Sequence, residues 1–456
     1  MSAPAARRRP GAQPAPRGAR RAGGLRGKAP PVALADPIER ALSDVLAAEA
    51  PADLALRAFF RAHPGLGRRD RAMVAETVFA VLRHRRLYEQ LAADGFGPHV
   101  RRLRWLSRCL RFADAPPQGD APMADWIGRA RRVEPDSLPP AVRFSLPDWL
   151  WEALAAQMPE SEAAALARAL LEPAALDLRV NTLKATREQL LAALDAHGVR
   201  AAPLTWPPDA VRVAGKPALD ALPALEQGWF EVQDAGSQLL AQLVAPRRGH
   251  TVVDFCAGAG GKTLALAALL RGSGQVFALD VSTARLTRLR PRLARSGATN
   301  VQPLGIDSEV DPKLERLAGR ADRVLVDAPC SGTGTLRRNP DIKWRQTAAG
   351  VAEMTRRQAS ILAAAARLVR PGGRLVYATC SLLDAENGAV ADAFAAAHPE
   401  FAPVSAAEVL AAQRTGPEGV GARLALRPEL HGCDGFFAAV FERVRERPGA
   451  AGADGP

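Results

Sequence analysis

The chain has 456 residues, of which 48% are hydrophobic and 24% charged, and its net charge is +13. This length exceeds an ordinary single domain and can supply more than one hydrophobic core, so we expect two or three domains. Five cysteines without a Cys-x-x-Cys pair and seven scattered histidines argue against a disulfide framework and a zinc site, and no apolar run is long enough to span a membrane, so we expect a cytoplasmic protein without a metal.

The first 30 residues are strongly basic. They hold eight arginines or lysines and no acidic residue, together with many prolines and glycines and almost no large apolar residue. A segment of this composition cannot bury a core, so we expect residues 1–30 to be a disordered tail. Such a tail either tethers RNA or has no role in binding, and the sequence leaves both open. We expect the last residues, 446–456, to be disordered as well.

Between residues 31 and 145 the apolar residues recur with a helical period. Ile38, Leu42, Val45 and Leu46 stand at i, i+4, i+7 and i+8, and the segment 73–82 has the same pattern. These stripes must bury against one another, which predicts a small helical bundle. Nine arginines interleave with the stripes, and they either line a phosphate-facing surface or form solvated helix faces. They are Arg68, Arg69, Arg71, Arg83, Arg85, Arg86, Arg101, Arg102 and Arg104.

Residues 146–235 are predicted to form a linker helix and a small α/β subdomain. Asp148 follows Leu146 and Pro147 and is predicted to cap the start of a helix. Extended segments at 178–183 and 211–213 predict two strands. A Thr-x-x-Gln capping box at Thr186 and Gln189 predicts a helix between them.

From residue 236 to residue 445 apolar strands alternate with amphipathic helices, a pattern typical of a parallel sheet that is covered on both faces. We therefore predict a doubly wound, Rossmann-like α/β domain. Its strands are expected at 251–255, 275–280, 301–306, 323–327, 374–378 and 436–441.

A glycine-rich loop follows the first strand of this sheet, where such sheets bind cofactors, although any tight strand-to-helix turn can be rich in glycine. A P-loop would need glycine at position 256 and a dinucleotide fingerprint would need it at 263, but the chain has Cys256 and Thr263 there. The remaining candidate is S-adenosylmethionine, with Asp280 placed for the ribose hydroxyls. Asp307 either contacts the adenine or ribose or caps a helix. The candidate cofactor-binding residues are Cys256, Ala257, Gly258, Ala259, Gly260, Gly261, Lys262, Asp280, Arg285, Asp307 and Asp327.

Two cysteines follow predicted strands. Cys330 ends the sequence DAPC and Cys380 is the centre of TCS. Because the carboxyl ends of neighbouring parallel strands meet at one edge, we expect both thiols in one crevice, whereas Cys109 and Cys433 fit the ordinary role of buried structural cysteines. A thiolate is a strong nucleophile and a good leaving group, so it suits addition to an aromatic ring such as cytosine and later expulsion.

Several of these segments together resemble the Sun/RsmB/Nop family of RNA cytosine-5 methyltransferases, and in particular its bacterial ribosomal RNA branch. Residues 69–83 of the N-terminal bundle are similar to the NusB-like RNA-binding domain which that branch carries. The matching segments are 179–184 (RVNTLK), 233–237 (QDAGS), 260–263 (GGKT), 327–344 (DAPCSGTGTLRRNPDIKW), 379–381 (TCS), 386–387 (EN) and 434–437 (DGFF).

The resemblance implies a class I methyltransferase sheet preceded by a small α/β insert and a NusB-like bundle. It also implies a monomer that transfers a methyl group from S-adenosylmethionine to C5 of a cytosine in RNA, with 16S ribosomal RNA as the expected partner. In that family the cysteine matching Cys380 attacks C6 and the one matching Cys330 assists product release. Asp327 would contact the ring, and Lys262 would lower the thiol pKa or be a surface lysine at a helix start. A transfer RNA substrate and a non-catalytic RNA-binding factor on the same scaffold stay open as alternatives.

Overall fold

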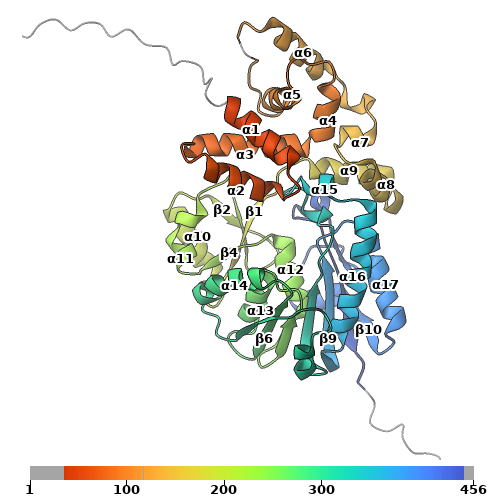
Figure 1. Ribbon diagram of the computed structural model, residues 1–456. Coiled ribbons are helices and arrows are strands. Elements are labelled where there is room, and N and C mark those ends of the chain that lie inside the picture. Colours follow the sequence, from red (N-terminus) through yellow and green to blue (C-terminus); the bar gives the residue numbers. More distant parts are fainter. Residues whose placement is uncertain (1–34, 117, 446–456) are drawn as a thin grey trace, which may run out of the picture.

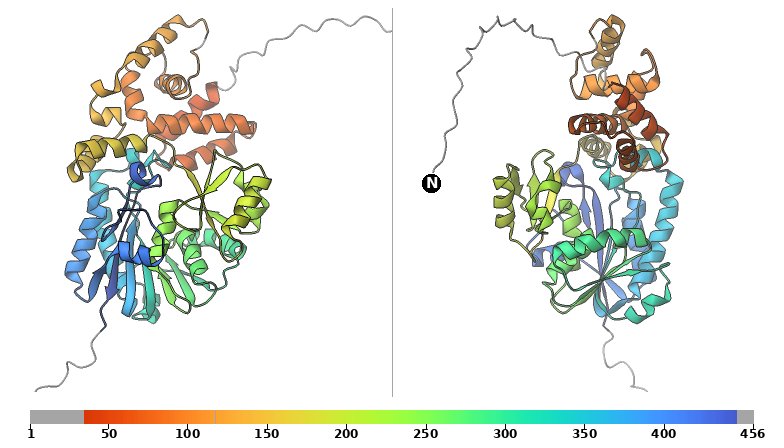
Figure 2. Two further views of the ribbon diagram at one scale, coloured as in Figure 1. Left: turned by 180° about the vertical axis from the view of Figure 1, so that it is seen from behind. Right: turned by 60° about the vertical axis from the view of Figure 1, so that its left-hand side comes forward.

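The computed structural model describes residues 35–116 and 118–445. Figure 1 shows a helical part at the top of the view, a small sheet beneath it and a large α/β part at the bottom. Two further views show that the helical part lies across one end of the large α/β part, and that the small sheet lies beside the large α/β part (Figure 2). The predicted tails at 1–30 and 446–456 lie outside the described residues.

The helical part begins with α-helices whose apolar stripes pack on one another. Ile38 and Leu42 of the first helix and Val78 of the third are at most 2% exposed, as their helical period predicted. The predicted helical bundle is therefore confirmed, while its likeness to NusB stays a prediction. Its helices are α1 (Ala35–Ala47), α2 (Ala52–Ala62), α3 (Arg68–Arg83), α4 (Arg85–Leu91), α5 (His99–Leu106) and α6 (Ala121–Arg132), with a π-helical turn (Ser107–Arg111) after α5.

Most of the nine arginines in this bundle are used within the protein. Arg104 and Arg101 pair with Glu39 of α1. Five more contact carbonyl or carboxylate oxygens of the bundle or of later segments, namely Arg71, Arg83, Arg85, Arg86 and Arg102. Only Arg68 and Arg69 are exposed without such a contact. Nearby oxygens therefore satisfy most of these guanidinium groups within the protein, and a phosphate-facing role for the arginines stays a prediction.

Three further helices connect the bundle to the rest of the chain: α7 (Pro140–Arg143), α8 (Asp148–Gln157) and α9 (Glu160–Leu170). The prediction that Asp148 caps a helix was wrong. Pro147 takes the capping position without a side-chain hydrogen bond, and the Asp148 carboxylate in the first turn binds the Arg86 guanidinium at 2.8 Å instead.

The small α/β part contains an antiparallel sheet in the order β2-β3-β1-β4. The predicted capping box is present, because Thr186 accepts from the backbone of Gln189 and Gln189 accepts from the backbone of Thr186. The elements are β1 (Leu176–Val180), α10 (Arg187–Ala196), β2 (Ala201–Pro203), β3 (Ala210–Val213), α11 (Pro223–Glu226) and β4 (Phe230–Val232).

The large part is built on a sheet with the order β10-β12-β9-β8-β5-β6-β7, and β11 pairs with β12. Strands β5 to β9 pair in parallel, and β12 runs antiparallel to β9. All six predicted strands are present, whereas the short β10 and β11 were not predicted. The strands are β5 (Thr251–Asp254), β6 (Gln275–Asp280), β7 (Val301–Gly305), β8 (Ala321–Asp327), β9 (Val369–Thr379), β10 (Phe401–Val404), β11 (Leu424–Leu426) and β12 (Phe436–Arg443).

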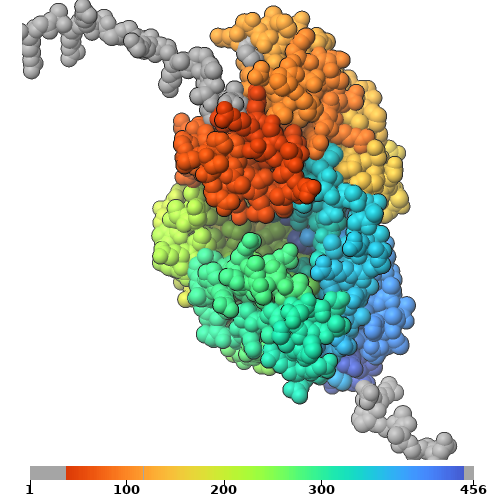
Figure 3. Space-filling model, viewed as in Figure 1, coloured from red at the N-terminus to blue at the C-terminus, as the bar shows by residue number. Residues whose placement is uncertain are grey.

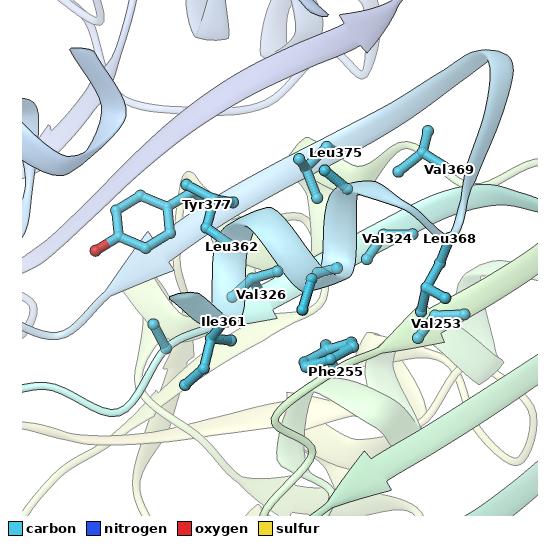
Figure 4. Packing of buried hydrophobic residues seen from close by; sticks show 14 of the residues in the cluster. Val253, Phe255, Val324, Val326, Ile361, Leu362, Leu368, Val369, Leu375 and Tyr377 are labelled. Carbon is cyan, nitrogen blue, oxygen red and sulfur yellow. The ribbon is translucent and has the colours of Figure 1, made fainter. Parts of the chain in front are cut away.

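Helices cover both faces of this sheet, as the alternation predicted. On one face α16 and α17 bury Val253, Val324 and Tyr377 of the central strands and Phe255 just after β5. Figure 4 shows these side chains with Ile361 and Leu362 of α16. On the other face α12, α13 and α18 cover a second core. The helices are α12 (Ala235–Val244), α13 (Gly261–Leu269), α14 (Thr283–Ser296), α15 (Ile342–Arg345), α16 (Ala348–Ala366), α17 (Gly388–Ala397), α18 (Ala406–Ala412) and α19 (Pro428–His431). Within the described ranges, no helix has both the length and the apolar character needed to cross a bilayer.

Candidate active site

A cavity of about 570 Å³ lies at the carboxyl ends of β5, β6 and β8. It is lined by the glycine-rich loop after β5, by the residues that follow β6 and β8, and by Cys380 after β9. Figure 3 shows that the molecular surface is hollowed between the helical part and the large α/β part. The predicted crevice is thus present at the edge of the sheet where parallel strands of this architecture bind ligands.

The glycine-rich loop is held by the carboxylate of Asp280. One oxygen of Asp280 accepts from the backbone N–H of Gly258 at 2.8 Å, and the other accepts from that of Ser282 at 2.7 Å. Gly258 has a φ of +56°, a conformation that favours glycine. Asp280 therefore joins the loops after β5 and β6 and still faces the cavity.

Two predicted cofactor residues do not line the cavity. Gly260 has a φ of +86°, and a Cβ atom there would lie 2.2 Å from a methyl carbon of Leu289, so this glycine permits close packing on α14. The carboxylate of Asp307 is 94% exposed, because β7 ends at Gly305 and Ile306 occupies the place beside the cavity. The other predicted cofactor residues all line it.

Asp254, the last residue of β5, is a site residue that the sequence reasoning missed. It is 0% exposed, and one of its oxygens accepts from the Thr263 hydroxyl at 2.7 Å while the other has no hydrogen-bond partner. Burial raises the pKa of Asp254 to about 7. Its place after an apolar strand and before the glycine-rich loop was the only signal in the sequence.

The two cysteines predicted to converge do so. The Sγ atoms of Cys330 and Cys380 are 3.3 Å apart, and both residues line the cavity. The parallel pairing of β8 and β9 aligns Asp327 with Ala378, so the loops after them start side by side. The pKa of Cys330 is raised well above its usual value. The main cause is the hydrogen bond with Cys380, and the second cause is burial.

A lysine and an aspartate lie beside the thiols. Lys262 Nζ donates to Asp327 Oδ2 at 2.6 Å, and the Lys262 side chain is 12% exposed. Burial alone would lower the pKa of Lys262, but the Asp327 carboxylate outweighs this effect and the pKa is raised. Lys262 therefore stays charged inside the cavity and is not a surface lysine.

The structure adds further residues to the cavity. Gln233 and Ser237 line it from the end of the small sheet and from α12, within a segment that the family resemblance marked without a role. Arg357 and Glu309 lie at the cavity with the predicted Arg285. Spacing in the sequence could not identify them, because they come from separate elements.

Models of known protein families match most of the region after residue 145. The family described as 16S rRNA methyltransferase RsmB/F matches residues 241–442, and the family described as the RsmF/B-like ferredoxin-like domain matches residues 146–220. The second match covers the helix α8 and most of the small sheet.

Curated proteins with similar sequences have related names. The probable ribosomal RNA small subunit methyltransferase B of Synechocystis sp. is 32% identical over 443 residues, which cover 88% of this chain and 98% of that protein. The ribosomal RNA small subunit methyltransferase B of Sodalis glossinidius is 37% identical over 265 residues, which cover 57% of this chain and 59% of that protein.

Solved structures show the same fold. The crystal structure of PH0851 has a TM-score of 0.75 and 27% identity, and the match covers 91% of this chain and 99% of that one. The structure of NSun6 from Pyrococcus horikoshii with SFG has a TM-score of 0.58 and 22% identity, and it covers 66% of this chain and 99% of that one.

Proposed function

The chain belongs to the RsmB/F methyltransferase family, as its sequence motifs predicted, and we propose that it transfers a methyl group from S-adenosylmethionine to C5 of a cytosine in small-subunit ribosomal RNA. The relatives' names support a ribosomal RNA substrate. The single observation that carries the choice of C5 is the pair of thiols 3.3 Å apart in one cavity. C5 of cytosine is unreactive until a nucleophile adds at C6, and a thiolate can add there and leave again.

The residues around the cavity fit S-adenosylmethionine. This cofactor carries an ammonium and a sulfonium, and the buried Asp254 oxygen without a partner is an acceptor that suits a cation. Asp280 faces the cavity beside the glycine-rich loop and suits the ribose hydroxyls. The NSun6 structure, which has the same fold, contains SFG, an S-adenosylmethionine analogue, and this supports the same ligand class. When bound, the cofactor supplies an electrophilic methyl group.

Four residues of the chain have separate roles in the proposed reaction. The Cys380 thiolate adds to C6 of the cytosine and thereby makes C5 nucleophilic. The Lys262 ammonium pairs with Asp327 and holds that carboxylate beside the thiols, and Asp327 contacts the ring at N3 or N4 and stabilises charge there. After C5 has been methylated, Cys330 and a base assist removal of the C5 proton and expulsion of Cys380.

The cavity also limits the form of the substrate. A cytosine inside a duplex cannot reach a thiol that lines a cavity, so the target base must leave its stack. We therefore infer that the substrate is a single-stranded or loop segment of RNA.

The test uses Cys380→Ala and Cys330→Ala in the full chain, with small-subunit ribosomal RNA and labelled S-adenosylmethionine. Cys380→Ala should abolish methylation and form no adduct. Cys330→Ala should leave a covalent protein–RNA complex that survives a denaturing gel, because attack proceeds and release stalls. Bisulfite sequencing of the wild-type product should show one 5-methylcytosine.

Three outcomes would contradict the proposal. An adduct with Cys380→Ala would reverse the roles of the thiols, and full activity in both variants would remove them from the chemistry. Methylation of transfer RNA instead of ribosomal RNA would keep the reaction and change the substrate.

A further inference from the structure

A carboxylate lies buried beneath the two cysteine loops. Glu386 ends a 3₁₀ turn (Asp384–Glu386) that follows β9, and it is 0% exposed. It does not line the cavity, and no ion pair involves it within the described residues. A buried carboxylate is costly unless hydrogen bonds satisfy it, so its contacts indicate what it does.

Both carboxylate oxygens bind the residues that follow the two cysteines. Oε1 accepts from the backbone N–H of Ser331 at 2.7 Å, and Oε2 accepts from the hydroxyls of Ser331 and Ser381. Gln358 of α16 donates to Oε1 at 3.0 Å. One side chain therefore connects the neighbour of Cys330 with the neighbour of Cys380, which lie 50 positions apart in the sequence.

The turn that carries Glu386 is itself fixed to the strand of Cys380. The Tyr377 hydroxyl of β9 donates to the backbone carbonyl of Glu386 at 2.6 Å. Asn387, the next residue, donates from its side chain to the carbonyl of Ser381 at 3.0 Å and accepts from the Thr379 hydroxyl. These contacts leave the carboxylate little freedom to move away from the two serines.

We propose that Glu386 is a positioning residue which holds the Cys330 and Cys380 loops together, so that the releasing thiol stays in contact with the attacking thiol. The inference rests on the proposed function for its catalytic consequence. The two loops also contact each other directly, because the Gly334 N–H donates to the carbonyl of Cys380 at 2.9 Å and the Ser331 and Ser381 hydroxyls lie 3.3 Å apart. Loss of the carboxylate therefore leaves the loops in contact, but it removes their shared acceptor and lets the two thiols move apart. Attack at C6 needs only Cys380, whereas release needs both thiols, so release suffers more.

The first experiment measures the reaction with Glu386→Ala, Glu386→Gln and, as a control, Asp384→Asn, which changes an exposed carboxylate of the same turn. Glu386→Ala should lower kcat about 100-fold, the loss typical of a displacement near 1 Å, while KM for RNA changes by less than about threefold. A covalent protein–RNA complex should persist on denaturing gels although Cys330 is present. Glu386→Gln keeps the shape and one acceptor, so it should restore about a tenth or more of the wild-type kcat.

The second experiment does not depend on methylation. Diamide oxidises two neighbouring thiols to a disulfide and is itself reduced to the hydrazine, so its rate reports thiol contact. Wild type and Asp384→Asn should form the Cys330–Cys380 disulfide rapidly, and Glu386→Ala should form it about tenfold more slowly. If the alanine variant does not fold, kcat and the rate of disulfide formation are compared between the glutamine variant and wild type instead.

Unchanged kcat and unchanged disulfide formation in a folded Glu386 variant would overturn the inference. A slower disulfide in Glu386→Ala together with an inactive wild type would instead support the positioning role and contradict the proposed function.

Discussion

Asp254 is the group whose ionisation should affect stability most directly. It is fully buried at the end of β5, it has no ion-pair partner within the described residues, and one of its oxygens makes no hydrogen bond. Burial raises its pKa from 3.8 to about 7. The substitution Asp254→Asn removes the charge at all pH values and keeps an oxygen that can accept from the Thr263 hydroxyl.

The size and sign of the effect on stability follow from the pKa of Asp254 in the unfolded chain, 3.8, and in the folded chain, about 7. Below pH 3.8 both the folded and the unfolded chain hold the proton, and the group adds no pH dependence. As the pH rises, the unfolded chain loses the proton first, so the folded state is destabilised progressively until the pH exceeds about 7. A shift of about 3 units corresponds to at most about 4 kcal/mol, and about 2.5 kcal/mol of this falls between pH 5 and pH 8.

The assay is thermal unfolding of wild type and Asp254→Asn at intervals from pH 5 to pH 8, without cofactor. The free energy of unfolding of the variant minus that of wild type should rise by about 2.5 kcal/mol over this range. This is roughly 5–10 °C in the relative Tm of the large α/β part when that part unfolds as one unit. Asp307→Asn is a matched control, because that carboxylate is 94% exposed. For this variant the difference in the free energy of unfolding from wild type should not change with pH.

Saturating S-adenosylmethionine should then stabilise wild type at pH 8 more than it stabilises Asp254→Asn, since a cationic ligand meets a carboxylate only in wild type. A difference between variant and wild type that stays constant from pH 5 to pH 8 would refute the reasoning about Asp254. An equal cofactor shift in both proteins would refute its role toward the ligand.

Three other changes test the geometry. Gly260→Ala should lower the free energy of unfolding by about 2 kcal/mol, because a side chain at positive φ meets α14, and an unchanged urea midpoint would contradict this. Diamide should link Cys330 to Cys380 in wild type, as peptide mapping would detect, and neither single alanine variant should show the link. Trp344→Ala should destabilise the contact between α15 and the helical part by about 2 kcal/mol, because the indole N–H donates to a carbonyl of α3 at 2.7 Å. If proteolysis cuts the helical part of Trp344→Ala and of wild type at equal rates, the prediction for Trp344 is contradicted.

Local patterns were sufficient to predict the class of fold. The alternation of apolar strands with amphipathic helices predicted six strands of the large sheet, and the capping box predicted α10, because periods of 2 and 3.6 and hydrogen bonds over three residues depend only on neighbours in the chain. The convergence of the two thiols was also predictable, since each cysteine follows a strand and parallel strands end at one edge.

Residues whose roles depend on distant partners were not predictable in the same way. The nine arginines of the bundle look alike in the sequence, and only the packing of α1 against α5 shows that Arg101 and Arg104 pair with Glu39. Asp307 was expected at the cavity because it follows a strand, but the strand ends two residues earlier and the side chain faces solvent.

The sequence by itself determined the order of the elements, the glycine-rich loop and the two cysteine motifs, because each of these is a property of a short segment. Only the tertiary structure decided that Asp254 is buried with an unpaired oxygen and that Glu386 joins the loops of Cys330 and Cys380. The physical reason is that burial and hydrogen bonding are set by residues that lie far apart in the sequence and meet only when the sheet and its helices close around them.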